Sequence, residues 1–254
     1  MPTAVDRDGL LLFAEGAYPD LDKDFLPLYR RSVECTAASV ERLYALFTAV
    51  RYLSASGIPG DVVECGVWRG GNCMLAALTL MSLGDDVRDV WLYDTFSGMS
   101  EPSTRDRDVY GGSALDMRGQ AHSAEGRPTP FQFIASLDDV KANMAATGFP
   151  DERTRYVEGR VEDTLPAERP REIALLRLDT DWYESTAHSM RHLFPLLVPG
   201  GVLLLDDYGD WPAVREAVHE CLDELGETLL LHRIDNTGRI AIRQRSPAAP
   251  QSRG

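Results

Sequence analysis

The chain contains 254 residues, of which 44% are hydrophobic, and it carries a formal net charge of −14 at pH 7. This length and composition fit one large globular domain with a sizeable core. The strong acidity argues against a protein that binds nucleic acids or anionic membranes through a basic surface. The sequence has no run of 18 apolar residues and no recognisable signal peptide, so we expect no membrane span. The four cysteines form no CxxC pair, so we expect no zinc site and a reduced, cytoplasmic setting.

Hydrophobic runs bounded by turn residues predict alternating helices and strands along most of the chain. The expected helices cover residues 33–54, 70–80, 136–147, 185–197 and 212–225. The expected strands cover residues 61–66, 90–93, 155–159, 173–178 and 201–205, and an antiparallel pair follows at 228–232 and 239–243. Continuous apolar runs are typical of strands that are buried on both faces. We therefore expect an α/β fold with a doubly wound, mostly parallel sheet and an antiparallel edge strand.

Three segments lack this periodicity and flank or interrupt the expected domain, which spans residues 33–245. Residues 1–32 are mixed and acidic, and we expect them to form an N-terminal arm or lid. Residues 97–130 are rich in Gly, Ser, Arg, Asp and Pro, which is typical of a long binding loop or lid. Residues 246–254 are rich in Pro, Ser and Ala, and we expect a disordered tail there.

Four aspartates follow two of the expected buried strands. Asp179 and Asp181 come after the first of these strands, and Asp206 and Asp207 come after the second. Ligands bind outside the carboxyl ends of the strands in open α/β sheets. If the two strands are parallel neighbours, the carboxylates converge, and they repel one another unless a cation lies among them. Oxygen ligands of this kind suit Mg²⁺, Ca²⁺ or Mn²⁺, although a solvated acidic loop edge is the simpler alternative.

A glycine-rich turn follows the strand at 61–66 and opens the next helix. Its G-x-x-x-G-G spacing differs from the dinucleotide-binding G-x-G-x-x-G, and Glu64 within it would repel phosphates and favour an ammonium group. Asp94, which ends the next strand, can accept both hydroxyls of a ribose, and Phe96 can pack on an adenine. An adenosine that carries an amino acid fits both ends, and S-adenosylmethionine is that molecule. A plain strand-to-helix connection and a capping role for Asp94 are the alternatives.

Five motifs then stand out together in the sequence. They are Val63-Glu64-Cys65-Gly66-Val67-Trp68-Arg69-Gly70-Gly71, Tyr93-Asp94-Thr95-Phe96-Ser97-Gly98-Met99, Glu162-Asp163-Thr164-Leu165-Pro166, Leu178-Asp179-Thr180-Asp181-Trp182-Tyr183-Glu184-Ser185-Thr186 and Leu205-Asp206-Asp207-Tyr208-Gly209. As a set, they resemble the macrocin O-methyltransferase family over roughly residues 33–243. The resemblance implies a Rossmann-like class I methyltransferase that uses S-adenosylmethionine and Mg²⁺. Members of the family methylate sugar hydroxyls on macrolides, aminocoumarins and related natural products, and they are commonly dimers or higher oligomers.

The resemblance also implies roles for individual residues. The metal ligands would be Asp179, Asp206 and Asp207, and Asp181 would be the base that takes the proton of the sugar hydroxyl. The cofactor contacts would be Glu64, Gly66, Asn72 and Thr36 at the methionine end, Asp94 at the ribose, and Arg160, Val161 and Glu162 at the adenine. Capping of a helix is an equally good explanation for Thr36.

Other side chains are alternatives for parts of this chemistry. Three histidines compete with Asp181 for the role of base: His188, His192 and His122. For the first two, which share a helix face, an ordinary and partly buried surface is the simpler explanation. Trp182, Tyr183 and Trp211 can pack either on a sugar or in the core.

We therefore expect an S-adenosylmethionine- and Mg²⁺-dependent O-methyltransferase that methylates a deoxysugar hydroxyl of a glycosylated natural product. The same chemistry on a phenol or catechol is the alternative, because the aspartates do not distinguish the two acceptors. The missing dinucleotide turn disfavours a nicotinamide-dependent oxidoreductase, and the four aspartates disfavour a non-catalytic nucleotide-binding module. The expected partners are a glycosylated small molecule and further copies of the chain.

Overall fold

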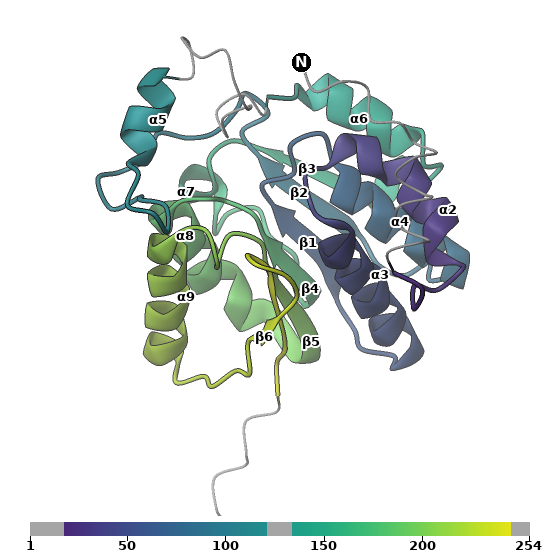
Figure 1. The fold of residues 1–254 in the computed structure, drawn as a ribbon. Helices are drawn as coiled ribbons and strands as arrows, with labels where there is room; N and C mark the ends of the chain where they lie inside the picture. Colours follow the sequence, from purple (N-terminus) through teal and green to yellow (C-terminus); the bar gives the residue numbers. More distant parts are fainter. Residues whose placement is uncertain (1–17, 121–133, 245–254) are drawn as a thin grey trace, which may run out of the picture.

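A seven-stranded sheet forms the centre of the computed structural model, which describes residues 18–120 and 134–244 (Figure 1). The strand order is β3-β2-β1-β4-β5-β7-β6. The strands are β1 Asp61–Cys65, β2 Val90–Asp94, β3 Thr154–Glu158, β4 Ile173–Leu178, β5 Leu197–Leu205, β6 His232–Arg233 and β7 Arg239–Ile242. Strands β1 to β5 pair in parallel, whereas β7 pairs antiparallel with β5 and β6. The predicted doubly wound α/β sheet with an antiparallel edge is thus confirmed.

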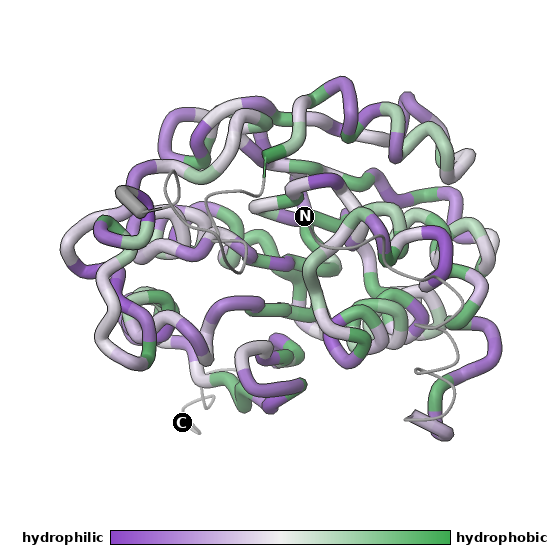
Figure 2. Tube along the Cα trace, turned by 45° about the horizontal axis from the view of Figure 1, so that its top comes forward, coloured by the Kyte–Doolittle hydropathy of each residue, from purple (hydrophilic) through white to green (hydrophobic). Residues whose placement is uncertain are grey.

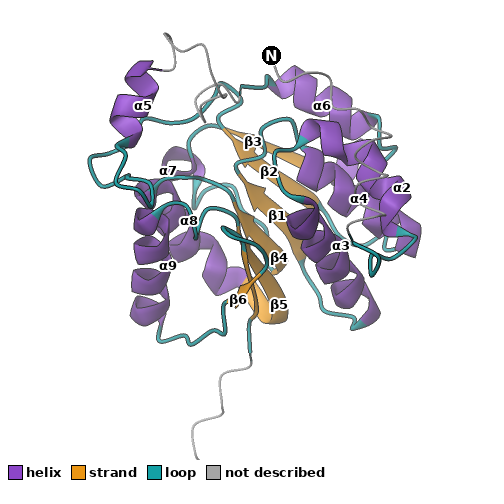
Figure 3. Cartoon of the chain, in the orientation of Figure 1, coloured by secondary structure: helices purple, strands orange, loops and turns teal. Residues whose placement is uncertain are grey.

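Helices cover both faces of this sheet (Figure 3). The helices are α2 Phe25–Ser32, α3 Val40–Ala55, α4 Gly71–Leu83, α5 Ala114–Gln120, α6 Leu137–Ala145, α7 Val161–Thr164, α8 Tyr183–Leu193 and α9 Pro212–Leu225, with short 3-10 turns at Val33–Cys35, Asp151–Arg153 and Phe194–Leu196. Helices α2, α3, α4 and α6 lie on one face, and α7, α8 and α9 lie on the other (Figure 1). Each face contributes one large cluster of buried hydrophobic residues. Among the described helices, none has the length and apolar character needed to cross a membrane.

The central strands β1, β4 and β5 are buried over the residues that lead to their carboxyl ends, as their apolar runs predict. All six residues of β4 are buried, although one of them is the arginine Arg177. Figure 2 shows hydrophobic segments running through the interior of the molecule and hydrophilic segments in many of the outer turns. Full burial of a Leu or Ile side chain contributes roughly 1.5–3 kcal/mol. The apolar strands therefore stabilise a rigid sheet whose carboxyl ends hold the loops of the site.

The N-terminal helical region differs from the expected helix at 33–54. Helix α3 begins at Val40, where the Ser39 side chain accepts a hydrogen bond from the Arg42 N–H and caps the helix. The chain is extended at Thr36, so the helical periodicity breaks there. Helix α2 precedes this break, and its Phe25 is fully buried in the core. The part of the expected arm from Phe25 onward therefore belongs to the packed domain, whereas residues 1–17 and the tail at 246–254 lie outside the described residues.

The long segment expected as a loop or lid at 97–130 contains a helix in its described part. Helix α5 lies beyond the carboxyl end of the sheet, close to the start of α8 (Figure 1). Its first residue, Ala114, is buried in a small cluster with Trp182, Trp211 and Val214. Residues 121–130 of the expected lid lie outside the described residues. The described part is packed against the domain.

Candidate functional site

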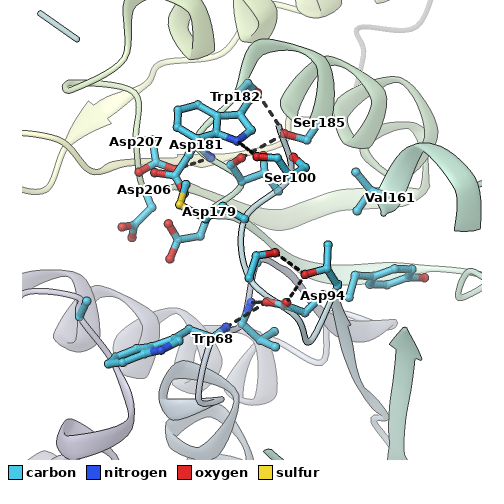
Figure 4. Close-up of a pocket in the computed structure, with 18 of the residues that line it drawn as sticks. Trp68, Asp94, Ser100, Val161, Asp179, Asp181, Trp182, Ser185, Asp206 and Asp207 are labelled. Atoms are coloured by element: carbon cyan, nitrogen blue, oxygen red, sulfur yellow. Dashed lines mark hydrogen bonds between the residues drawn. The ribbon is translucent and has the colours of Figure 1, made fainter. Parts of the chain in front are cut away.

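A cavity of about 330 Å³ opens at the carboxyl ends of β1, β2, β4 and β5 (Figure 4). One part of it, the glycine-turn half, is lined by Thr36, Gly66, Asn72, Asp94, Arg160, Val161 and Glu162. The other part, the acidic half, is lined by Asp179, Asp181, Asp206, Asp207 and Asp210. This is the edge at which an open α/β sheet binds its ligands. The strands therefore bring the two motifs predicted from the sequence to one cavity.

Asp94 organises the glycine-turn half. Its Oδ2 accepts hydrogen bonds from the backbone N–H groups of Val67 at 2.8 Å and Trp68 at 3.0 Å, and its Oδ1 accepts one from the N–H of Phe96 at 2.8 Å. Trp68 and Phe96 both have positive φ angles, which cost free energy in residues other than glycine. Asp94 thus holds two unfavourable turns in place while its carboxylate lines the cavity.

Gly66 allows the turn after β1 to approach the end of β4. Its φ is +82°, and a Cβ placed on it would lie 1.9 Å from the backbone oxygen of Asp179. We expect Gly66→Ala to lower the free energy of unfolding by at least about 2 kcal/mol, because it adds both a backbone clash and a strained φ. Urea unfolding measures this change.

Gly84→Ala is the matched control for Gly66→Ala. Gly84 also has a positive φ, of +66°, but a Cβ there has open space around it. We expect its cost to be about 1 kcal/mol, from the φ angle alone. Equal losses in the two variants would contradict the close approach of the turn to β4.

Glu64 lies elsewhere than the sequence predicts. It is 3% exposed, does not line the cavity, and accepts hydrogen bonds from Asn72 at 3.0 Å, from the Cys73 thiol at 2.7 Å and from Arg177. The expected direct contact of Glu64 with a ligand ammonium group does not fit this arrangement, because the arginine takes the place of that cation. Glu64 instead orients Asn72, whose side chain does line the cavity.

Phe96 is a second residue whose expected role does not fit the structure. Its side chain is 6% exposed and packs in the hydrophobic core that includes Ala135 and Val140, and it does not line the cavity. Because the ring is buried there, the expected packing of Phe96 on an adenine does not fit this arrangement.

The remaining residues expected to contact the cofactor all lie at the cavity. Thr36 donates a hydrogen bond to Asn72 Oδ1 at 3.2 Å, and its own oxygen accepts one from the Ala38 N–H. Arg160, Val161 and Glu162 begin α7 and line the cavity beyond the end of β3. The structure thus brings Thr36, Gly66, Asn72, Asp94 and residues 160–162 together.

In the acidic half, three carboxylates form a tight group. One oxygen from each of Asp179, Asp181 and Asp207 lies within 4.8 Å of the others. The Asp181 N–H also donates to Asp207 Oδ2 at 3.1 Å, and Asp181 has a φ of +60°. Burial, followed by the charges of neighbouring carboxylates, raises the pKa values of Asp181 and Asp207 well above their ordinary range. A cation among these oxygens would relieve that repulsion, so the group fits a divalent metal ion.

Asp206, expected as the third metal ligand, is engaged by two arginines. One of its oxygens contacts Arg177 of β4, and the other contacts Arg42 of α3. Burial raises the pKa of Asp206 to about 6, although both arginines act to lower it. The group of three close carboxylates contains Asp179, Asp181 and Asp207 and does not include Asp206. A metal ion bound by Asp206 would therefore share a carboxylate oxygen with an arginine.

Arg177 and Arg42 form the cationic frame of the acidic half. Arg177 contacts Asp179 at 2.9 Å and also pairs with Glu64 and Asp206, so one buried cation joins the ends of three strands. Burial acts to lower the pKa of Arg177, but the carboxylates around it raise it overall. Arg42 Nε lies 3.0 Å from Asp235 in the turn between β6 and β7, and Asp235 also accepts a hydrogen bond from Ser39 at 2.7 Å.

The histidines proposed as alternative bases lie away from the cavity. The rings of His188 and His192 are 4.4 Å apart on α8, and His188 contacts the backbone oxygen of Leu165. Burial and the neighbouring His188 lower the pKa of His192. Neither residue lines the cavity, which agrees with an ordinary, partly buried helix face. His122 lies outside the described residues.

Of the three aromatic residues near the aspartates, Trp182 alone lines the cavity. It packs edge-on against the buried Trp211 with 5.0 Å between ring centroids. The Tyr183 hydroxyl points to Glu220 of α9. Trp182 is therefore the aromatic side chain that a ligand in the acidic half would contact.

Sequence reasoning missed four charged residues at or near the cavity. They are Arg42, Asp106, Arg177 and Asp210. A signal for one of them was present, because an arginine inside the apolar run of residues 173–178 is buried at a high cost unless carboxylates surround it. The other three depend on contacts between distant segments.

The sequence is similar to a known protein family over most of its length. The model of the family Macrocin-O-methyltransferase (TylF) matches residues 27–243. The chain is 35% identical over 226 residues to the 8-demethyl-8-(2,3-dimethoxy-alpha-L-rhamnosyl)-tetracenomycin-C 4'-O-methyltransferase of Streptomyces olivaceus, which covers 89% of this chain and 82% of that protein. It is 37% identical over 209 residues to the mycinamicin III 3''-O-methyltransferase of Micromonospora griseorubida, which covers 82% of this chain and 78% of that protein.

A solved structure supports the same relationship. The O-methyltransferase NovP aligns with 94% of this chain and 98% of its own, with a TM-score of 0.70 and 28% sequence identity.

Proposed function

The chain belongs to the macrocin O-methyltransferase family and has the Rossmann-like fold of class I O-methyltransferases, and from this premise we propose that it methylates a sugar hydroxyl of a glycosylated natural product. The observation that carries the proposal is the single cavity in which a glycine turn and Asp94 face a group of carboxylates. S-adenosylmethionine would occupy the glycine-turn half, and the acceptor sugar the acidic half. One relative acts on a rhamnosyl compound, as its name states, and this supports the choice of acceptor.

Contacts to S-adenosylmethionine follow from the chemistry of the lining residues. The second N–H of the Asn72 amide is available to the methionyl carboxylate, and the Thr36 hydroxyl would turn to it from Asn72. Gly66 leaves room for the methionine part of the cofactor. The carboxylate of Asp94 can accept the ribose hydroxyls while the backbone N–H groups of Val67 and Trp68 also donate to it. Residues 160–162 begin a short helix beside the place left for the adenine.

We propose that Asp179 and Asp207 bind Mg²⁺ and that Asp181 is the general base. When bound, Mg²⁺ would supply a positive charge that lowers the pKa of the sugar hydroxyl. Asp181 accepts the hydroxyl proton. The hydroxyl oxygen then forms a bond to the methyl carbon as the bond from that carbon to the sulfonium sulfur breaks, which yields the methyl ether and S-adenosylhomocysteine. Asp206 holds the arginines of the frame in this proposal, and ligation by Asp206 is the alternative.

Calorimetric titration of S-adenosylhomocysteine tests the cofactor assignment. We expect binding both with Mg²⁺ and with EDTA, because the metal lies on the acceptor side of the cavity. Binding in neither condition would contradict the proposed function. Methyl transfer to a glycosylated macrolide, its aglycone and a catechol then tests the acceptor, and we expect a product with the glycoside alone.

The metal site predicts an unusual dependence of stability on pH. The raised pKa values of Asp181, Asp206 and Asp207 mean that the folded protein binds protons more tightly than the unfolded chain, in which an Asp titrates near 3.8. The stabilisation that these protons provide is present at low pH and is lost as the pH rises through the raised pKa values. The metal-free protein should therefore unfold at a higher temperature at about pH 5 than at about pH 7.5.

Mg²⁺ should reverse this trend, because the ion must displace protons from the carboxylates to bind. We expect it to raise the unfolding temperature more at about pH 7.5 than at about pH 5. Thermal unfolding in EDTA and in Mg²⁺ at the two pH values measures the effect. An equal increase at both pH values would contradict metal binding in the acidic half.

We further propose that the enzyme acts in the cytoplasm as a homodimer or higher oligomer. The four cysteines support a reducing compartment, because all of them are buried as thiols and none is joined in a disulfide.

A further inference from the structure

A segment of the chain far from the aspartates in sequence lines the cavity with Met99 and Ser100 and bonds to the loops of the acidic half. We call residues 99–114 the covering segment. The Trp182 Nε1–H donates to the Ser100 backbone oxygen at 3.2 Å (Figure 4), and the Val109 N–H donates to the Asp210 backbone oxygen at 2.9 Å. The covering segment is thus attached to both loops that carry the carboxylates, the one after β4 and the one after β5.

Asp106 is the most buried polar residue of the covering segment, with 1% of its surface exposed. Its Oδ2 accepts hydrogen bonds from the N–H and the hydroxyl of Ser103, at 2.7 and 2.8 Å. Its Oδ1 accepts one from the N–H of Tyr183 at 2.9 Å. Tyr183 is the first residue of α8, and Trp182 in the N-cap position makes no side-chain cap. Asp106 therefore caps α8 from a distant part of the chain, and its negative charge suits the helix N-terminus.

This cap lies two residues from Asp181, whose backbone needs support. A residue other than glycine in the left-handed region costs roughly 1–2 kcal/mol and persists only when its surroundings hold it. The Asp181 N–H is bound by Asp207, and the Trp182 N–H donates to the Thr180 oxygen at 2.7 Å. The bond from Tyr183 to Asp106 fixes the next peptide along.

We propose that Asp106 is a positioning residue, which caps α8 from the covering segment and thereby holds Asp181 in its reactive orientation. Asp106 does not line the cavity, so it acts through the loop and not on the ligands. The consequence is that the base is correctly placed only while the covering segment is docked. The inference rests on the proposed function, because it assigns the effect of Asp106 to the step in which Asp181 accepts a proton.

Three variants test this role: Asp106→Ala, Asp106→Asn and, as a matched control, Asp108→Ala. Asp108 lies in the same segment, and its carboxylate accepts hydrogen bonds from the N–H groups of Tyr110 at 2.9 Å and Gly112 at 2.7 Å, both within that segment. We expect Asp106→Ala to lower kcat by about 10- to 100-fold, which is the range for a misplaced catalytic group. The affinity for S-adenosylhomocysteine should be unchanged, because the glycine-turn half is separate.

The conservative variant and hydrogen exchange distinguish positioning from a general loss of structure. Asp106→Asn should recover most of kcat, because the amide oxygen can still accept from the Tyr183 N–H. Backbone amides of residues 182–186 should exchange faster in Asp106→Ala than in the unmodified protein, whereas Asp108→Ala should match the unmodified protein in both exchange and kcat.

Three outcomes would overturn the role of Asp106. They are unchanged kcat in Asp106→Ala, equal losses in Asp106→Ala and Asp108→Ala, and a parallel loss of S-adenosylhomocysteine binding that shows collapse of the whole site. Absence of methyl transfer by the unmodified protein would instead overturn the proposed function, and with it the role given to Asp106.

Discussion

Asp181→Asn should lower kcat by about 10²- to 10⁴-fold, because the amide cannot accept the proton of the sugar hydroxyl. The variant keeps the size of the side chain, and its backbone N–H can still donate to Asp207. Binding of S-adenosylhomocysteine and of Mg²⁺ should remain, since Asp179 and Asp207 are still in place. Steady-state kinetics with a glycosylated acceptor gives kcat, and calorimetry gives the two affinities.

Asp210→Asn is the control for this experiment. Asp210 also lines the cavity, but it stands outside the group of three carboxylates. We expect its kcat to change by less than tenfold, which means that the activation free energy changes by less than about 1.4 kcal/mol. Loss of Mg²⁺ binding in Asp181→Asn would move Asp181 into the set of metal ligands, and the division of roles among the aspartates would then be wrong.

Arg177→Met should lower the free energy of unfolding by about 3–5 kcal/mol. The substitution keeps a long side chain but removes the cation that pairs with Glu64, Asp179 and Asp206. Breaking a buried ion pair from one side leaves the partners charged and desolvated, which is the costly case. Arg177→Lys should lower the free energy of unfolding by less, because the ammonium group keeps the charge. It should still be destabilised, because an ammonium group lacks the planar set of N–H donors with which a guanidinium reaches several carboxylates. Urea unfolding of the metal-free protein measures each loss.

The matched control for Arg177 is Arg191→Met. Arg191 on α8 makes a two-pronged pair with Glu224, but the two side chains are 42% and 52% exposed. An exposed pair of this kind contributes about 0–1 kcal/mol, so we expect a small loss. A similarly small loss in Arg177→Met would show that water or rearrangement compensates the buried carboxylates.

The sheet was predictable because most of its strands can be recognised from the local pattern of apolar and turn residues. Each parallel strand except β3 contains a short apolar run between turn residues, and five strands alternating with helices leave few topologies. The meeting of Asp179 and Asp207 followed from strand ends alone. It required that β4 and β5 be parallel neighbours, and they are.

The partners of each carboxylate were not predictable, because they depend on register. Arg177 stands opposite Glu64 in the pairing of β1 with β4, and that register turns the charge of Glu64 away from the cavity. A shift by one residue would have placed it on the other face. The burial of Phe96 in the core was not predictable either, since it depends on contacts with distant residues and nothing in its residue type suggests its positive φ.

The contact between α3 and the turn after β6 has a consequence for how the protein is made. Ser39 bonds to Asp235 across 196 residues of sequence, and Arg42 bridges Asp235 and Asp206. The N-terminus of a chain emerges first from the ribosome, and domains begin to fold during synthesis. The glycine turn and Asp94 are therefore synthesised early. The acidic half is complete only after Asp235, near the end of the described residues, has been synthesised and has paired with Arg42. A chain cut before Asp235 would leave Arg42 paired with Asp206 alone.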